Sequence, residues 1–314
     1  MTIFYPGLES LSQPELPSPP SLVQRSVSLA PLTSFRVGGP AAWYAAPRTL
    51  EALRSCLQWA QDGGLPLTWL GAGSNLLISD AGLPGLVIHT RYLRGLHFDD
   101  ETGQVRAAAG ESIARLAWLA AARGWEGLEW AVGIPGTIGG AVVMNAGAHG
   151  AWTSQLLRQV ELLSRFGGKP QLSEPEALAF SYRTSGLQTG EWVVTQAQIQ
   201  LAPGGDPQRV RTITAEHLRA RKSTQPYNLP SCGSVFKNPG PQTAGWLIEH
   251  TGLKGYQIGQ AQVSQLHANF ILNCGGATAS DIWRLICHVQ DQVEQHWSIR
   301  LRPEVQILGE FPAI

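Results

Sequence analysis

The sequence predicts an α+β protein in which helices and short strands are interleaved along the chain. Its 314 residues and mass of 33.9 kDa exceed the size at which one hydrophobic core usually stops growing, so two or three subdomains are expected. Hydrophobic residues make up 43% of the chain and charged residues only 15%, against a usual charged share of about 25%. This composition indicates a folded globular protein and excludes a disordered one.

Four segments have the apolar spacing of an amphipathic helix. Their apolar positions are, in order, Leu50, Leu53, Leu57 and Ala60; Ile113, Leu116, Ala117 and Ala120; Val210, Ile213 and Leu218; and Ile282, Leu285, Ile286, Val289 and Val293. Gly63-Gly64 ends the first pattern, and the second stops before Gly124. The fourth follows Ser280-Asp281, whose side chains can cap the free N–H groups of the first turn.

Runs of strand character lie between these helices. They are Leu67–Leu70, Leu86–Ile88, Val105–Ala108, Val160–Leu163, Val193–Leu201, Ala268–Asn273 and Val305–Leu308. This interleaving, with glycine-rich turns after strands, favours an α/β or α+β chain. The uncharged segment 131–148 is about as long as a membrane span. Pro135 and several glycines would weaken or break such a helix, so we interpret the segment as buried loop and strand and expect no membrane association.

Charge and cysteine content narrow the possible partners. Lysine plus arginine and aspartate plus glutamate both total 23, so the chain lacks the basic excess that drives binding to nucleic acid. The cysteines Cys56, Cys232, Cys274 and Cys287 form no CxxC pair, which argues against a zinc site and for reduced thiols in a cytoplasm. The first residues lack the features of an export signal. Their prolines and serines indicate a flexible leader.

Two loops of small, uncharged residues are candidate sites for a large anionic cofactor. Their sequences are Gly71-Ala72-Gly73-Ser74-Asn75 and Gly133-Ile134-Pro135-Gly136-Thr137-Ile138-Gly139-Gly140-Ala141. Such loops expose backbone N–H groups, and without Cβ atoms they allow a diphosphate to approach closely. Neither loop is a P-loop or a GxGxxG fingerprint that opens a helix after the first strand. The first loop alone is equally typical of a tight turn.

Further motifs surround the two loops in a fixed order. They are TSFRVGGPA (33–41), GAGSNLLISDAGLPG (71–85), GLEWAVGIPGTIGGAVVMNAGAHG (127–150), SYR (181–183), CGSVFKNP (232–239), HANFILN (267–273) and RPE (302–304). This series resembles the UDP-N-acetylenolpyruvoylglucosamine reductase family and covers the chain from about Leu32 to Leu308. Only the leader lies outside the resemblance.

The resemblance implies a two-subdomain FAD-binding unit, with the flavin fold of the PCMH type, followed by a C-terminal α/β substrate-binding domain. The expected boundaries are a leader at 1–28, FAD-binding subdomains at 29–98 and 99–203, and the substrate domain at 204–314. The family's longer form carries an extra loop with a tyrosine that folds over the substrate. One strand and one helix separate Arg183 from Ser234 here, so the chain resembles the shorter form.

The resemblance also implies a cytoplasmic enzyme of peptidoglycan synthesis, with no protein partner expected. NADPH would reduce noncovalently bound FAD, and the reduced flavin would reduce UDP-N-acetyl-3-O-(1-carboxyvinyl)-glucosamine to UDP-N-acetylmuramate. One alternative is another FAD oxidoreductase, an oxidase of alcohols or sugars, for which His149 is the candidate for covalent flavin attachment. A second alternative is a non-catalytic nucleotide-binding module, which would not need Arg183, Ser234 and Glu304 together.

The chemistry of this reaction suits the residues that match the family's catalytic positions. Hydride transfer to the terminal vinyl carbon leaves an enolate, which needs electrophilic stabilisers and a proton donor. Arg183 can fork onto the substrate carboxylate, and Ser234 matches the family's proton-donating serine. Glu304 matches its catalytic glutamate, and a protonated form with a raised pKa is expected beside an enolate. The alternative is that Glu304 simply forms an ion pair with Arg302.

Other residues match positions that the family uses around the UDP-sugar or NADPH. These candidate substrate-binding residues are Tyr182, Lys222, Asn238, Lys254 and His267. The two lysines among them carry positive charges, which suit a diphosphate. Two alternatives stay open, since Lys254 could be a solvated turn lysine and His267 a core histidine. No metal site is expected.

Overall fold

The computed structural model describes residues 18–313, which begin with a mixed four-stranded sheet. Its strands are β1 (Gln24–Ser28), β2 (Pro40–Ala45), β3 (Leu67–Leu70) and β5 (Leu83–His89), in the order β1-β2-β5-β3. β1 runs antiparallel to β2, whereas β2 and β3 run parallel to β5. Leu53 and Leu57 of helix α1 (Leu50–Asp62) belong to one hydrophobic cluster with Leu86 and Ile88 of β5. The end of the predicted leader therefore forms a strand.

A second, antiparallel sheet has five strands in the order β11-β10-β12-β7-β6. The strands are β6 (Leu96–Asp99), β7 (Gln104–Ala108), β10 (Leu157–Ser164), β11 (Gly167–Ser173) and β12 (Trp192–Gln200). Helices α2 (Ile113–Ala122) and α3 (Ile138–Val143) share its hydrophobic core. A short hairpin of β8 (Gly147–Ala148) and β9 (Ala151–Trp152) follows α3.

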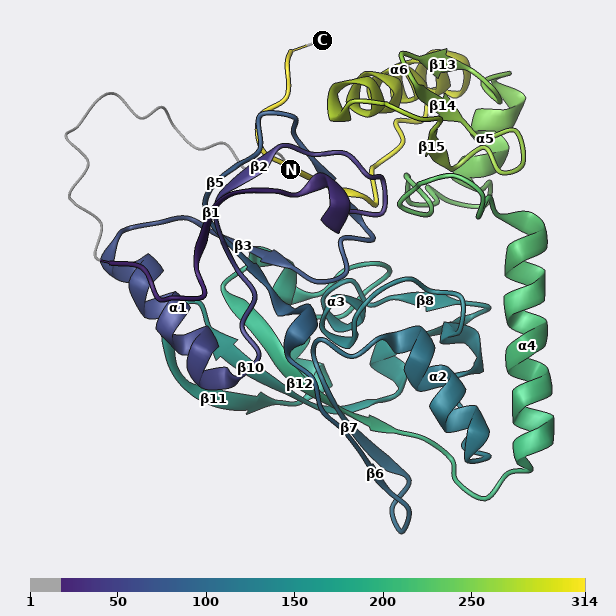
Figure 1. Cartoon of the computed structure of the whole chain (residues 1–314). Helices are drawn as coiled ribbons and strands as arrows, with labels where there is room; N and C mark the ends of the chain where they lie inside the picture. Colours follow the sequence, from purple (N-terminus) through teal and green to yellow (C-terminus); the bar gives the residue numbers. More distant parts are fainter. Residues whose placement is uncertain (1–17, 314) are drawn as a thin grey trace.

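Helix α4 (Pro207–Thr224) packs along α2 and leads from this sheet to the C-terminal domain (Figure 1). That domain contains α5 (Ala244–His250), β13 (Gln257–Ile258), β14 (Ala261–Val263), β15 (Ile271–Asn273) and α6 (Ala279–Trp297). Val263, Leu285 and Val289 lie in its buried core. Short 3-10 helices connect elements at Ala30–Leu32, Thr90–Tyr92, Glu129–Ala131, Thr153–Gln155, Pro175–Leu178 and Gly186–Thr189.

The last strand returns to the first half of the chain. β16 (Gln306–Leu308) pairs in parallel with β4 (Leu76–Ile78), which directly follows the first glycine loop. Asp80 adds a second link, because its carboxylate accepts from the backbone N–H groups of Ala279 and Ser280 at 2.8 Å each. These contacts place the residues before β16 beside the glycine loop.

The four predicted helices are confirmed, but two local predictions are wrong. Helix α6 is capped by Thr278, which exchanges hydrogen bonds with Asp281 in a capping box, so Ser280 lies inside the first turn. The segment 131–148, predicted as loop and strand, contains helix α3, because the Thr137 hydroxyl accepts from the Gly140 N–H and caps that helix.

The strand predicted over 268–273 is shorter in the structure. Only Ile271–Asn273 pair with β14. Asn269 instead uses its side-chain amide to bind both the N–H and the carbonyl of Phe236, at 2.9 and 2.8 Å. In the part of the chain described, no helix is both long and apolar enough to cross a membrane.

Candidate active site

The two predicted glycine loops face each other although they are far apart in the sequence. A Cβ atom added to Gly71 would lie 2.9 Å from the Thr137 hydroxyl, and one added to Gly136 would lie 3.6 Å from the Ser74 hydroxyl. The first loop follows β3, and the second runs into α3, which begins at Ile138. The two loops, which we call the cradle, therefore lie against each other, and their glycines place no Cβ atoms that would keep a bound group away from the backbone.

The backbone N–H groups at the end of the second loop are already used. Those of Ile138 and Gly139 donate to the carbonyls of Glu111 and Ala109, at 2.8 and 2.9 Å. The N–H groups of Gly140 and Ala141 donate to the hydroxyl and carbonyl of Thr137. Ile138 is buried in the hydrophobic core, so Gly139, Gly140 and Ala141 offer a bound group their small size and not free donors. Their predicted role in cofactor binding therefore rests only on how closely a ligand can approach their backbone.

A positively charged side chain lies beside the second loop, which itself carries no charge. A Cβ on Gly133 would be 2.4 Å from Cδ of Arg221, which extends from α4. The buried Nε of Arg221 and the buried Nδ1 of His217 have no hydrogen-bond partner among the residues described. A buried guanidinium donor next to Gly133, which has no side chain, suits a diphosphate, so these residues fit FAD. Helical periodicity marks α4 in the sequence, but it does not indicate that its polar face meets this loop.

One residue near Arg221 is His149, the candidate named above for covalent flavin attachment. His149 lies just after β8, and its ring stacks on His217 with the centroids 4.3 Å apart. The hydroxyl of Tyr227 donates to the Gly133 carbonyl at 3.4 Å. Sequence reasoning missed both His217 and Tyr227.

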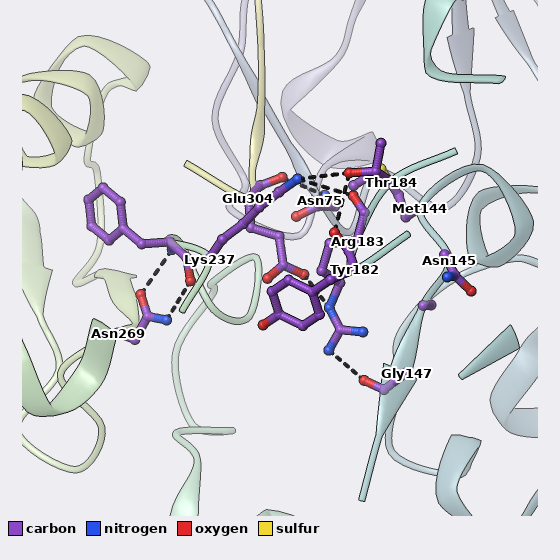
Figure 2. Close-up of polar contacts among 12 residues, drawn as sticks. Asn75, Met144, Asn145, Gly147, Tyr182, Arg183, Thr184, Lys237, Asn269 and Glu304 are labelled. Atoms are coloured by element: carbon purple, nitrogen blue, oxygen red, sulfur yellow. Dashed lines mark hydrogen bonds and ion pairs between the residues drawn. The ribbon is translucent and has the colours of Figure 1, made fainter. Parts of the chain in front are cut away.

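Arg183, in the turn before β12, and Glu304, just before β16, form an ion pair (Figure 2). Nε of Arg183 lies 2.9 Å from Oε1 of Glu304, and the two side chains are only 21% and 17% exposed. Nη2 of Arg183 donates to the Gly147 carbonyl at 2.6 Å. The two predicted catalytic charges are thus in contact, on elements that are distant in the sequence.

The environment of Glu304 shifts its protonation equilibrium. Burial raises the pKa of the Glu304 carboxyl above its ordinary value, while the Arg183 guanidinium and the Lys237 ammonium oppose that rise. Burial is the largest of these effects. Arg302 is exposed, and its backbone carbonyl accepts from the Lys237 N–H at 2.9 Å. In the described part of the chain, Glu304 pairs with Arg183 and not with Arg302.

Ser234 lies on the segment that runs beside Glu304. The Glu304 N–H donates to the Val235 carbonyl at 2.7 Å, and Phe236 forms a β-bridge with Pro303. Ser234 is half-buried and directly precedes this paired segment. All three predicted catalytic residues are therefore in one region. Arg183 and Glu304 are in direct contact, and Ser234 directly precedes the segment that pairs with residues 303 and 304.

The predicted substrate-binding residues divide into two groups. Tyr182 is 53% exposed and its ring lies 5.2 Å from Cζ of Arg183, while Lys222 is exposed in the last turn of α4. The other three are gathered around α5. Asn238 accepts from the Ala244 N–H at 3.0 Å, Lys254 binds Glu249 at 2.7 Å, and His267 packs on Phe270.

These contacts bear on the alternatives for two residues. Lys254 forms an ion pair with Glu249 at the surface, so both alternatives for it stay open. His267 is half-buried, and burial lowers the pKa of its imidazole. No group of His, Cys, Asp and Glu suited to a metal ion occurs within residues 18–313.

Comparison with known proteins assigns both halves of the chain. The FAD binding domain family matches residues 41–168, which include both glycine loops. The family described as UDP-N-acetylenolpyruvoylglucosamine reductase, C-terminal domain, matches residues 225–308, which include Ser234 and Glu304. The fold and the site therefore define an FAD-dependent oxidoreductase.

Individual relatives are similar over almost the whole chain. The UDP-N-acetylenolpyruvoylglucosamine reductase of Nostoc punctiforme is 62% identical over 94% of this chain and 89% of its own length. That of Synechococcus sp. (strain JA-3-3Ab) is 60% identical over 92% of each chain. The crystal structure of the Thermus caldophilus enzyme matches with a TM-score of 0.78 and 36% identity, over 91% of this chain and 99% of that one. The chain belongs to the UDP-N-acetylenolpyruvoylglucosamine reductase family.

The facing loops make Gly71 a test of the cofactor cradle. In Gly71→Val, the new Cβ would meet the Thr137 hydroxyl at 2.9 Å, so the loops must separate. We expect FAD affinity to fall at least about tenfold, the equivalent of ~1.4 kcal/mol, measured by flavin absorbance during dialysis. Gly240→Val is the control, because a Cβ there meets no atom within 4 Å.

The same samples test how the flavin is attached. Acid precipitation of the parent protein should leave yellow flavin in the supernatant, as expected for noncovalent FAD. Flavin retained in the pellet would instead indicate a covalent bond. Unchanged FAD affinity in Gly71→Val would show that the cradle is not where the cofactor binds.

Proposed function

We propose that this chain reduces the enolpyruvyl ether of UDP-N-acetyl-3-O-(1-carboxyvinyl)-glucosamine to UDP-N-acetylmuramate, using NADPH, for peptidoglycan synthesis in the cytoplasm. The observation that carries the proposal is the contact between Arg183 and Glu304 beside the segment that carries Ser234. Bound FAD supplies the hydride, which it receives from NADPH. The residues of the chain bind and orient the substrate and deliver the proton.

Arg183 is the candidate anchor for the substrate carboxylate. Its guanidinium remains charged at any physiological pH and can bind a carboxylate through two parallel hydrogen bonds. In the structure, Nε binds Glu304 and Nη2 binds the Gly147 carbonyl. The substrate's carboxylate therefore competes with the Glu304 carboxylate for the same guanidinium.

This competition gives Glu304 its proposed role. A second carboxylate on Arg183 adds a negative charge next to Glu304 and removes its ion-pair partner, and both changes raise the pKa of a carboxyl that burial already raises. Protonated Glu304 can then donate a hydrogen bond to the enolate instead of repelling it. Ser234, from the adjacent segment, donates the proton that completes the reduction.

We also propose roles for the surrounding residues and the domain boundaries. The loops 71–75 and 133–141, with Arg221, hold FAD. Tyr182, Lys222, Asn238, Lys254 and His267 bind the UDP-sugar or NADPH. FAD-binding subdomains at 29–98 and 99–203 precede a substrate domain at 204–314, an arrangement consistent with the separate hydrophobic cores of the second sheet and of the C-terminal domain.

Separate measurement of the two half-reactions tests this function. By stopped-flow absorbance, NADPH should bleach the flavin of the parent enzyme, and the enolpyruvyl UDP-sugar should restore its colour without oxygen. In Ser234→Ala, bleaching should be unchanged, while reoxidation should slow by roughly 10²–10⁴-fold, the range for a lost general acid. Equal slowing of both steps would show that the serine positions the cofactor and does not donate a proton.

Glu304 gives a prediction with a defined pH dependence. Because the protonated form is required, reoxidation by the substrate should decline as pH rises through the raised pKa of this carboxyl. Glu304→Gln keeps a neutral hydrogen-bond donor and should retain at least about tenfold more activity than Glu304→Ala, which loses it. If both variants are equally inactive while substrate still binds, a carboxyl that exchanges its proton is required, and a static donor is the wrong description.

A further inference from the structure

Lys237 lies next to the catalytic ion pair, and no step of the reaction above uses it. Its ammonium donates to the Arg183 carbonyl at 3.3 Å and to the Thr184 hydroxyl at 3.1 Å (Figure 2). Its own N–H donates to the Arg302 carbonyl at 2.9 Å. The side chain therefore joins the C-terminal domain to the turn that carries Arg183.

That turn has an unfavourable backbone conformation. Arg183 has φ of +55°, in the left-handed region that residues other than glycine seldom adopt. Ser181 and Thr184 exchange backbone hydrogen bonds across the turn, at 3.0 and 3.1 Å. The Arg183 carbonyl accepts from the Gln188 amide at 3.1 Å as well as from Lys237. Such a conformation persists only where surrounding contacts hold it.

These contacts are of two kinds, local and long-range. Gln188 and Thr184 belong to the same local segment as Arg183, so their hydrogen bonds stabilise the turn itself. Lys237 comes from the strand-like segment that pairs with residues 302 and 303, directly before Glu304. A bond from Lys237 thus sets the position of Arg183 relative to Glu304, which the local contacts do not do.

We propose that Lys237 is a positioning residue that holds Arg183 against Glu304 across the domain junction and places a second positive charge beside that carboxylate. The proposal rests on the function proposed above. The Lys237 ammonium acts through Arg183 and Glu304, because its hydrogen bonds are to protein atoms. Three donors on one flexible stem allow it to bind both the Arg183 carbonyl and the Thr184 hydroxyl.

The titration of Glu304 reports this role directly. The groups that interact with its carboxylate are Arg183, Lys237 and the buried thiol of Cys232, whose pKa the negative charge of Glu304 helps to raise. Of these, Arg183 and Lys237 both lower the pKa of Glu304. Removal of the Lys237 charge must therefore raise that pKa, whereas loss of a purely structural contact would not change it in a defined direction.

The experiment compares Lys237→Met, which removes the charge and the donors, with Lys237→Arg, which keeps both. Lys169→Met is the matched control, because Lys169 is exposed on β11. All three proteins should bind FAD and be reduced by NADPH at the parent rate. We expect Lys237→Met to slow reoxidation by the enolpyruvyl UDP-sugar roughly 10- to 100-fold, as for a misplaced catalytic group, and its pH midpoint to move upward.

Carbon-13 NMR of labelled glutamate, assigned with Glu304→Gln, measures the pKa of Glu304 without substrate. We expect this pKa to rise in Lys237→Met and to stay near the parent value in Lys237→Arg and Lys169→Met. An unchanged titration together with an unchanged reoxidation rate in Lys237→Met would overturn the proposal. Equal slowing of both half-reactions, with an unchanged titration, would overturn it in favour of a general structural role.

A second variant covers the case in which Lys237→Met does not fold. Thr184→Val removes one hydrogen-bond partner of Lys237 but keeps the charge, so it should slow reoxidation and raise the pKa of Glu304 less than Lys237→Met does. A parent-like rate in Thr184→Val would then contradict the positioning role. Failure of the parent flavin to be reoxidised by the UDP-sugar would contradict the proposed function alone, because the titration needs no substrate.

Discussion

The ion pair between Arg183 and Glu304 is the interaction on which the rest of the site depends. Its two charges come from different halves of the molecule and are largely shielded from water. Loss of one partner from a buried pair typically costs about 3–5 kcal/mol, because the other charge is left unpaired. The correct relative position of the two halves is therefore coupled to the electrostatics of the site, and each half holds its own charge in place.

Glu304 is held by strand pairing. β16 follows it directly and pairs with β4, so the Glu304 backbone lies beside the first glycine loop, where the Asn75 amide donates to the Glu304 carbonyl at 3.1 Å. Arg183 is held in a left-handed turn by local hydrogen bonds and by Lys237. The first glycine loop and the Glu304 carboxyl thus share one strand junction. A movement of the C-terminal domain would change both.

Local chemistry made part of this arrangement predictable. The two glycine loops stand out because small, uncharged residues are concentrated there, and the SYR and RPE motifs carry Arg183 and Glu304. Helices were predicted well where apolar spacing was regular, as in α1 and α6. The short helix α3 was missed because its glycines have low helix propensity, and a cap at Thr137 with packing against the sheet outweighs that propensity.

The remaining features depend on tertiary contacts that no local pattern encodes. Arg221 reaches the second loop only because α4 packs along α2, and periodicity predicts that helix but not the neighbour of its polar face. Lys237 lies within a recognisable motif, yet its side chain donates to a turn that is distant in the sequence. Asp80 caps α6 from a distant part of the sequence. Each of these contacts forms only in the folded chain.

In the function proposed above, the substrate carboxylate replaces Glu304 on Arg183, the pKa of Glu304 rises, and Glu304 takes up a proton from the solvent. Calorimetric titration of the oxidised enzyme with the enolpyruvyl UDP-sugar, in buffers of different ionisation enthalpy and over a range of pH, measures the protons taken up on binding. We predict a maximum uptake of about one proton, at a pH between the pKa values of Glu304 in the free and bound enzyme, and none in Glu304→Gln. Binding without proton uptake, or the same uptake in Glu304→Gln, would contradict this exchange.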